Sequence, residues 1–159
     1  SGAVISYLRQ LGFKIFIVTN QPVIARGWLT EKKLREIHEQ YQRNLFKQNE
    51  DAKIDKFYYR PHHPTANIKK YRKNCICRKP KPGMLKKAAR EFKIDLQKSY
   101  MIGDRISDVI AGKLAGCITV QCQTGEHKNT MIETDLKIDK VYQADFVIKD
   151  IRELMRVIK

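Results

Sequence analysis

Long apolar runs are absent from this chain of 159 residues. No stretch approaches the roughly 18 consecutive apolar residues that a membrane-spanning helix needs. The first ten residues lack a basic segment followed by a long apolar one, so they do not resemble a secretory signal peptide. Cysteine is scarce too, with four residues, and a disulfide framework would be unusual for a domain of this size. We therefore expect a cytoplasmic protein with no membrane partner.

Acidic residues are few compared with basic ones. The chain has 17 Asp or Glu against 32 Lys or Arg, which gives a formal net charge of +15. Residues 53–93 alone hold 14 Lys or Arg and two acidic residues. A surface of this charge attracts anions in general. Such a charge is consistent with a solvated basic face, with a site for a phosphorylated small molecule and with a nucleic-acid interface. The net charge alone does not distinguish these three possibilities.

Internal repeats, linkers and low-complexity tracts are also absent, and the composition is that of a globular protein with 42% hydrophobic and 31% charged residues. Hydrophobic periodicity then predicts alternating helices and strands. We expect helices over 4–11, 30–47, 83–92, 107–115 and from 150 onward, and strands over 14–19, 54–59, 99–103, 117–123 and 144–148. Residues 20–29 and 60–82 are expected to be loops.

This alternation predicts an α/β fold, a Rossmann-like parallel sheet with helices on both faces, in a single domain over 1–159. In such sheets the active site lies at the carboxyl ends of the strands. Thr19-Asn20-Gln21 and Gly103-Asp104 both follow apolar strands. A hydroxyl, two amides and a carboxylate would therefore meet at one edge, although a Thr-Asn pair after a strand is also ordinary turn chemistry.

Two further segments carry charge suited to a phosphate. Arg78-Lys79-Pro80-Lys81-Pro82-Gly83 precedes a helix, where cations and N-terminal amides attract anions; the same residues also suit a solvated basic loop. Asp104 and Asp108 stand four residues apart at a strand-to-helix junction, where carboxylates commonly bind Mg²⁺ together with substrate phosphate. Ser107 or Asp108 is also suited to capping the helix.

The order and spacing of these segments resemble a known family. Val18-Thr19-Asn20-Gln21, Cys77-Arg78-Lys79-Pro80 and Met101-Ile102-Gly103-Asp104 are similar to the second, third and fourth motifs of the haloacid dehalogenase (HAD) phosphatases. With Ile24-Ala25-Arg26-Gly27 and Pro61-His62-His63-Pro64, they resemble the branch of D-glycero-D-manno-heptose 1,7-bisphosphate phosphatases and histidinol-phosphate phosphatases. The resemblance extends from the first helix to the last strand and implies a HAD-like fold.

The resemblance also implies roles for individual residues. Thr19 and Asn20 would bind the transferring phosphoryl group, Lys79 would neutralise its charge, and Asp104 would bind Mg²⁺. Three more side chains would contact the substrate: Gln21, Arg78 and Arg105.

In this branch a loop of the form Cys-x-His and Cys-x-Cys binds structural zinc. His62, Cys75 and Cys77 stand at three of the four ligand positions, but Arg60 replaces the first cysteine. A guanidinium cannot bind a metal, and structural zinc needs four ligands. Either His63 takes the fourth position or the site has been lost. The loop also has Pro22-Val23 where a Ser-Gly type pair is common in the branch.

The family's first motif, Asp-x-Asp, is missing from the 159 residues. Its first aspartate is the nucleophile, which cations and amides cannot replace. In the family it ends a central strand between the strands that lead to Thr19 and Asp104. We therefore expect the first strand to be missing, the domain to be incomplete at its N-terminus, and this chain by itself to be inactive.

The leading functional interpretation is a Mg²⁺-dependent phosphomonoesterase, a monomer, that acts through an aspartyl-phosphate on a sugar phosphate such as heptose 1,7-bisphosphate. Histidinol phosphate and a polynucleotide 3′-phosphate are alternative substrates. The net charge favours the polynucleotide, whereas the resemblance of the Cys/His loop over 60–77 favours a small molecule. The third alternative is an inactive pseudophosphatase that binds a phosphorylated ligand.

Overall fold

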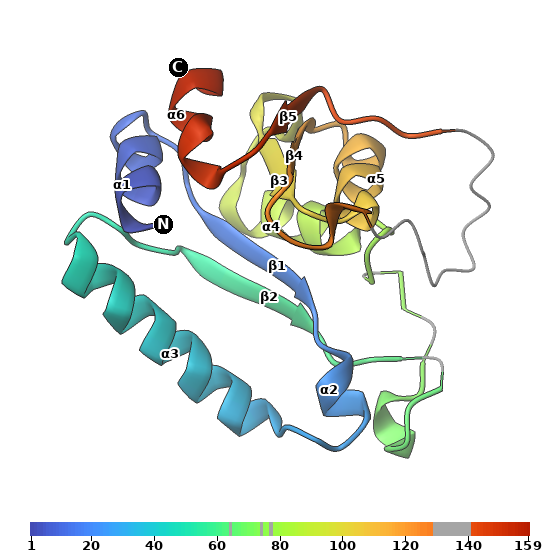
Figure 1. Ribbon diagram of the computed structural model, residues 1–159. Coiled ribbons are helices and arrows are strands. Elements are labelled where there is room, and N and C mark those ends of the chain that lie inside the picture. Colours follow the sequence, from blue (N-terminus) through green and yellow to red (C-terminus); the bar gives the residue numbers. More distant parts are fainter. Residues whose placement is uncertain (64, 74, 77, 129–140) are drawn as a thin grey trace. The chain divides into compact units, whose positions relative to one another are not determined.

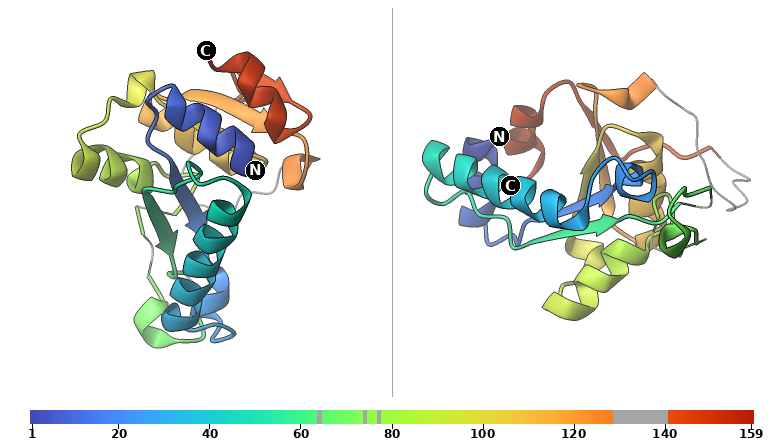
Figure 2. Two further views of the ribbon diagram at one scale, coloured as in Figure 1. Left: turned by 90° about the vertical axis from the view of Figure 1, so that its left-hand side faces the viewer. Right: turned by 90° about the horizontal axis from the view of Figure 1, so that it is seen from below.

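The computed structural model describes all residues except 64, 74, 77 and 129–140. It divides into two compact units. The first comprises residues 1–75 and 158–159, and the second comprises residues 76–157. Figure 1 shows the elements of both units along the chain, and Figure 2 shows them from two further directions. All of the strand pairs in the described part are parallel, which confirms the predicted α/β class.

The first unit contains a two-stranded sheet. Strand β1 (Phe16–Asn20) pairs in parallel with β2 (Lys56–Arg60), with Phe16 opposite Lys56 and Asn20 opposite Arg60. Because parallel neighbours need a crossover, the chain between them forms helices. The remaining elements of the unit are α1 (Gly2–Gln10), α2 (Pro22–Ala25), α3 (Glu31–Gln48) and the short 3₁₀ helix η1 (Lys69–Tyr71).

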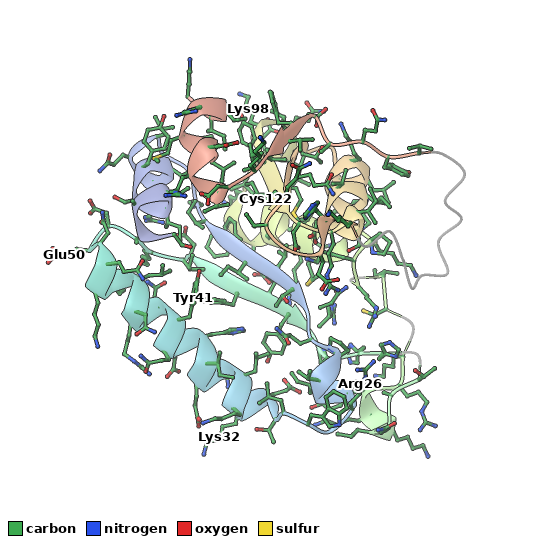
Figure 3. The ribbon with its side chains drawn as sticks, viewed as in Figure 1. Arg26, Lys32, Tyr41, Glu50, Lys98 and Cys122 are labelled. Carbon is green, nitrogen blue, oxygen red and sulfur yellow. The ribbon has the colours of Figure 1, made fainter. Side chains whose placement is uncertain are left out.

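Helix α3 begins within one residue of the predicted start, with Thr30 as its N-terminal cap. The Thr30 hydroxyl accepts a hydrogen bond from the Lys33 amide at 3.1 Å, which satisfies one of the free donors at the helix start. One side of α3 contacts β2, where the His38 ring stacks on Phe57 with centroids 4.3 Å apart. Tyr41, labelled in Figure 3, meets the same phenyl ring edge-on. Burial lowers the pKa of His38, so this ring is neutral at pH 7 and packs as an aromatic residue.

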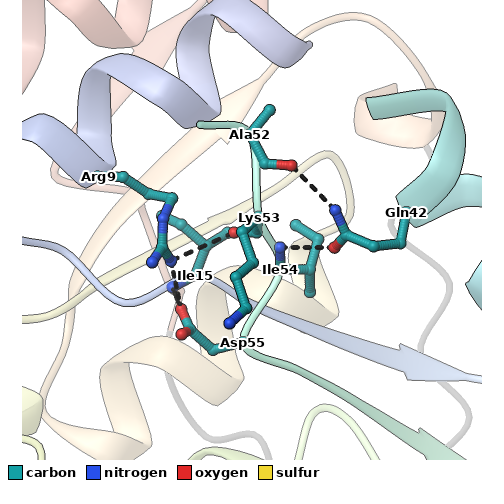
Figure 4. Close-up of polar contacts among 7 residues, drawn as sticks. All are labelled: Arg9, Ile15, Gln42, Ala52, Lys53, Ile54 and Asp55. Carbon is teal, nitrogen blue, oxygen red and sulfur yellow. Dashed lines mark hydrogen bonds and ion pairs between the residues drawn. The ribbon is translucent and has the colours of Figure 1, made fainter. Parts of the chain in front are cut away.

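Side-chain hydrogen bonds hold the amino-terminal ends of β1 and β2 together (Figure 4). The Asp55 carboxylate accepts from the Ile15 amide at 2.7 Å and from the Arg9 guanidinium at 2.9 Å. The Gln42 amide accepts from the Ile54 amide at 2.8 Å and donates to the Ala52 carbonyl at 3.0 Å. Helices α1 and α3 therefore each contribute a polar side chain that satisfies backbone groups before the sheet begins.

A carboxylate at the start of α3 anchors the long loop that follows β2. Glu31 accepts from the hydroxyls of Tyr59 at 3.0 Å and of Tyr71 at 2.6 Å. The hydrogen bond from Tyr71 is the largest reason that the pKa of Glu31 lies below its usual value. Tyr71 also belongs to a buried apolar cluster with Ile24, Ala25, Leu34 and Ala66. Hence the loop is fixed at η1 by both packing and hydrogen bonds.

The second unit is built on a three-stranded parallel sheet in the order β3–β4–β5. The strands are β3 (Tyr100–Gly103), β4 (Ile118–Cys122) and β5 (Phe146–Ile148). Its helical elements are α4 (Gly83–Phe92), η2 (Leu96–Lys98), α5 (Ile106–Ala115), η3 (Glu126–Lys128), η4 (Ile151–Glu153) and α6 (Leu154–Val157). Helix α5 packs on β3 and β4, and its residues 108–112 are all buried.

Helix α5 ends at Gly116, which adopts a left-handed conformation with φ of 85°, as a glycine after a helix often does. Cys117 then leads into β4. Its thiol is buried, and this burial raises its pKa to about 11. The thiol therefore stays protonated at physiological pH and packs as a small apolar group.

Asp145 joins α5, β4 and the start of β5. Its carboxylate accepts from the Lys113 ammonium and from both the backbone amide and the hydroxyl of Thr119, the last two at 2.8 Å. The Asp145 amide in turn donates to the Thr119 hydroxyl at 3.1 Å. Thr119 is fully buried, so these bonds satisfy a polar group inside the core. The contact with Lys113 is the main cause that lowers the pKa of Asp145 to about 2.

Most predicted elements are confirmed within a few residues, and the predicted helix over 83–92 has the bounds of α4. Two loop predictions are wrong in part, since 20–29 contains α2 and 60–82 contains η1. The predicted sheet forms as two parallel sheets, with β1 and β3 in different ones. None of the helices in the described part of the chain has the length and apolar content that a bilayer crossing requires.

Replacing Asp145 with asparagine should destabilise the protein. Asp145→Asn removes the ion pair with Lys113 while keeping a side chain of the same size, and the partly exposed site suggests a loss of about 1 kcal/mol in the free energy of unfolding. The native pKa lies below the unfolded value of 3.8, so the contribution of Asp145 is present above pH 4 and is lost as the pH falls toward 2. Urea unfolding at pH 7 and at pH 2–4 measures both effects.

Asp150→Asn is the matched control. The Asp150 carboxylate also pairs with a basic side chain, Arg152, but the pair is two residues apart and exposed. Asparagine also retains the cap to the Arg152 amide. We expect little change in its stability. Equal losses in the two variants, or a pH-independent loss in Asp145→Asn, would contradict the assigned role of Asp145.

Candidate functional site

Asp104 directly follows β3, at the carboxyl end of the second unit's sheet. Its Oδ2 accepts from the Glu126 amide at 2.8 Å, and the Gln121 side chain donates to its backbone carbonyl at 3.4 Å. Within the described part of the chain, Oδ1 has no hydrogen-bond partner. A carboxylate with one oxygen held and the other available suits a hard divalent cation such as Mg²⁺. The described residues contain no cluster of three or more His, Cys, Asp or Glu placed to bind a metal by themselves.

Lys79 reaches the turn that carries Asp104. Its ammonium group lies 2.5 Å from Oδ1 of Asp108, and the two side chains are only 13% and 6% exposed. Lys79 precedes the buried Pro80, to which it is joined by a cis peptide bond, in a turn closed by a bond from the Lys81 amide to the Arg78 carbonyl. This turn leads into α4. A fixed cation is therefore held beside the end of β3.

Asp108 has two functions, of which the sequence indicated one. Its Oδ2 accepts from the Arg105 amide at 3.1 Å, which confirms the proposed cap of α5. Its Oδ1 holds Lys79, a role that the sequence did not reveal. A Cβ on Gly103 would overlap the Asp108 side chain, so the close approach needs glycine there. The available signal was an acidic residue within an apolar helix, because buried carboxylates are normally paired with cations.

The predicted substrate-binding cations lie around this turn. Arg78 is adjacent to Lys79, and Arg105 is adjacent to Asp104. Arg105 is 58% exposed and lies 4.0 Å from the Glu126 carboxylate, which is 51% exposed. An exposed pair at this distance is weak, so Glu126 contributes little to holding the Arg105 guanidinium in place.

The first unit carries the other predicted phosphate-binding residues. Thr19 and Asn20 are the last two residues of β1, and Gln21 follows them. The Gln21 side chain donates to the Thr19 hydroxyl at 3.3 Å, and the Gln21 amide donates to the Arg60 carbonyl at 2.9 Å. The three residues therefore form one polar group at the carboxyl end of β1. The proximity of Thr19 to Asp104 stays a prediction, because the two residues belong to different units.

The predicted zinc ligands lie in the loop after β2, except that Cys77 falls outside the described residues. His62 packs near Tyr71, and its buried Nδ1 has no hydrogen-bond partner among the residues that the structure describes. Burial is the first cause that lowers the pKa of His62, followed by the charges of Arg60 and Lys73. A neutral imidazole with a buried, unpartnered nitrogen suits a metal ligand. Cys75 is partly buried.

Comparison with known proteins identifies relatives over nearly the whole chain. Residues 76–154 match the HAD-hydrolase-like family. The chain is 39% identical over 153 residues to the D-glycero-beta-D-manno-heptose-1,7-bisphosphate 7-phosphatase of Photorhabdus laumondii, covering 96% of this chain and 76% of the relative. It is also 39% identical over 109 residues to the corresponding alpha-heptose phosphatase of that organism, covering 69% of this chain and 58% of the relative.

A solved structure has the same fold. The D,D-heptose 1,7-bisphosphate phosphatase of B. bronchiseptica, complexed with magnesium and phosphate, superposes with a TM-score of 0.79 at 29% identity, covering 99% of this chain and 80% of that one. These similarities agree with the resemblance noted in the sequence. The chain belongs to the HAD-like phosphatases, in the family of the heptose-bisphosphate phosphatases.

Proposed function

We propose that this protein is a Mg²⁺-dependent phosphomonoesterase whose substrate is a heptose 1,7-bisphosphate. The observation that carries the proposal is the turn after β3, where the shielded Lys79 is held by Asp108. The same turn begins with a strand-end carboxylate, Asp104, whose Oδ1 has no hydrogen-bond partner among the described residues. Phosphoryl transfer depends mainly on positioning and on neutralising the charge of the transferred group. The proposal is also supported by a relative named as a heptose-1,7-bisphosphate 7-phosphatase, which aligns over 96% of the chain.

The proposed roles belong to residues at the carboxyl ends of β1 and β3 and in the turn before α4. Thr19 and Asn20 would donate hydrogen bonds to the phosphoryl oxygens, and Gln21 would orient the Thr19 hydroxyl. Lys79 would neutralise charge on the transferring group, while Arg78 and Arg105 would bind the remainder of the substrate. Asp104 would hold Mg²⁺, which supplies further charge neutralisation when bound. The reaction also requires a carboxylate nucleophile, and the 159 residues contain no Asp-x-Asp motif to supply it.

The choice of substrate is open to direct assay. Relatives named for the beta and for the alpha anomer of heptose 1,7-bisphosphate are both 39% identical to the chain over the matched regions. The net charge of +15 keeps a polynucleotide 3′-phosphate as a second candidate. Phosphate release from both anomers, from histidinol phosphate and from a 3′-phosphorylated oligonucleotide separates the candidates. A steep fall of oligonucleotide turnover with salt would identify the nucleic acid as the substrate.

Asp104→Asn should remove Mg²⁺-dependent turnover. In the product of the whole gene we expect phosphate release from heptose 1,7-bisphosphate to fall by about 100-fold or more, since a neutral amide binds the cation poorly. The variant should unfold at nearly the wild-type temperature, because asparagine retains an acceptor for the Glu126 amide. The 159-residue chain alone should show no turnover, for want of a nucleophile. Retained activity with unchanged Mg²⁺ dependence would refute the role of Asp104.

Lys79 and Asp108 should be strongly coupled. Lys79→Gln leaves a carboxylate buried without its cation, and Asp108→Asn leaves the cation without its carboxylate. Each should lower the free energy of unfolding by about 3 kcal/mol. The double variant should lose less than the sum of the two, which urea unfolding at pH 7 measures. Lys87→Gln removes half of an exposed i,i+4 pair in α4 and should change stability little. Additive losses would show that the pair is not an energetic unit.

We further propose that the loop around His62 binds zinc weakly. His62 and Cys75 suit the metal, but Arg60 stands at the first ligand position of the family pattern and cannot bind it. Zinc content by metal analysis should be well below one per chain, and a mild chelator should remove it. Arg60→Cys should raise both occupancy and resistance to chelation, and adding His62→Ala should abolish the gain. Stoichiometric zinc that survives chelation in the wild type would show that another side chain completes the site.

A further inference from the structure

The loop after β4 closes over the Asp104 carboxylate. Strands β3 and β4 are parallel neighbours with Gly103 opposite Gln121, so both strands end at the same edge of the sheet. From there the chain continues through Gly125 to Glu126, the first residue of η3. The Glu126 backbone amide donates to Oδ2 of Asp104 at 2.8 Å. This is the one hydrogen bond made by the Asp104 carboxylate within the described residues.

The approach of this loop depends on a missing side chain. A Cβ built on Gly125 would overlap Oδ2 of Asp104, at a separation that real Cβ atoms do not show. Any other residue at this position would push either the loop or the carboxylate aside. Gly125 therefore brings the next amide within hydrogen-bonding distance of Asp104.

The side chain of Glu126 contributes little to this contact. Its carboxylate points toward Arg105 at 4.0 Å, and both groups are more than half exposed. Exposed pairs of this kind contribute little to stability. The donor that holds Asp104 is thus part of the main chain and does not depend on which side chain residue 126 carries, provided that the residue has an N–H.

We propose that Gly125 and the backbone amide of Glu126 are positioning elements for the proposed metal ligand Asp104. The inference rests on the proposed function. A carboxylate has two oxygens with about four acceptor sites. Fixing Oδ2 by an N–H limits rotation of the group and leaves Oδ1 oriented for a cation. Partners that orient a metal ligand in this way typically change metal affinity by about 10–100-fold when they are removed.

Two substitutions at residue 126 separate the amide from the side chain. Glu126→Pro removes the N–H, and the first residue of a helix is the position where proline is best tolerated. Glu126→Ala removes the carboxylate and keeps the N–H. Mg²⁺ affinity of the full-length protein, measured by titration calorimetry, should weaken by about 10-fold or more in Glu126→Pro and by less than about 2-fold in Glu126→Ala.

Gly125→Ala supplies an independent variant. It keeps the amide and adds one methyl group against Oδ2, so it should weaken Mg²⁺ binding as Glu126→Pro does. If Glu126→Pro does not fold, the comparison of Gly125→Ala with Glu126→Ala decides the question. In turnover assays, the apparent KM for Mg²⁺ should rise in the affected variants while kcat at saturating Mg²⁺ changes little, since Asp104 itself remains.

Two outcomes would overturn the inference. The first is equal Mg²⁺ affinity in Glu126→Pro, Gly125→Ala and wild type; the second is equal weakening in Glu126→Ala and Glu126→Pro. Failure of the proposed function has a different signature. In that case Asp104→Asn would leave Mg²⁺ binding unchanged, whatever the substitutions at 125 and 126 do.

Discussion

A lysine ammonium shielded from water needs an anionic partner. In the second unit this requirement connects the turn before α4, which carries Lys79, to the start of α5, which carries Asp108. Asp108 provides the partner for Lys79 from the first turn of α5, while its second oxygen accepts from the Arg105 amide. One carboxylate thus fixes the turn before α4 and the turn after β3 at the same time. A buried charge is costly unless its partner is in place. Movement of either turn would therefore leave Lys79 or Asp108 as a buried charge without its partner.

The parallel arrangement of the strands explains why the proposed site residues lie at strand ends or in the loops that follow them. Parallel neighbours are joined by crossovers, so each strand ends in a segment that leaves the sheet at the same edge. Thr19, Asp104 and Glu126 all lie at or just after the carboxyl end of a strand. Their positions are set by backbone pairing and by the clusters packed beneath them. Specific contacts then fix the loops themselves. Glu31, for example, holds the loop after β2 through its hydrogen bond from Tyr71.

Much of this organisation was predictable from the sequence. Apolar periodicity located α3, α4, α5 and strands β1 to β5, and the resemblance of the motifs around Thr19, Lys79 and Asp104 to those of the HAD family indicated a phosphatase. Helix α2 was missed because Pro22 is typical of loops, although it also suits the first position of a helix. The pairing of Lys79 with Asp108 was missed because it joins residues 29 positions apart. The contact of the Glu126 amide was not predictable, since a backbone donor leaves no trace in residue identity.

The buried thiol of Cys117 can be used as a chemical probe of local unfolding in the second unit. A buried thiol with a pKa of about 11 does not react with alkylating reagents while the unit is closed. Modification has to wait for local or global unfolding, which exposes the group and returns its pKa toward the ordinary value. The rate of labelling at Cys117 therefore measures how often the three-stranded sheet loosens, and ligands that stabilise this unit would slow it.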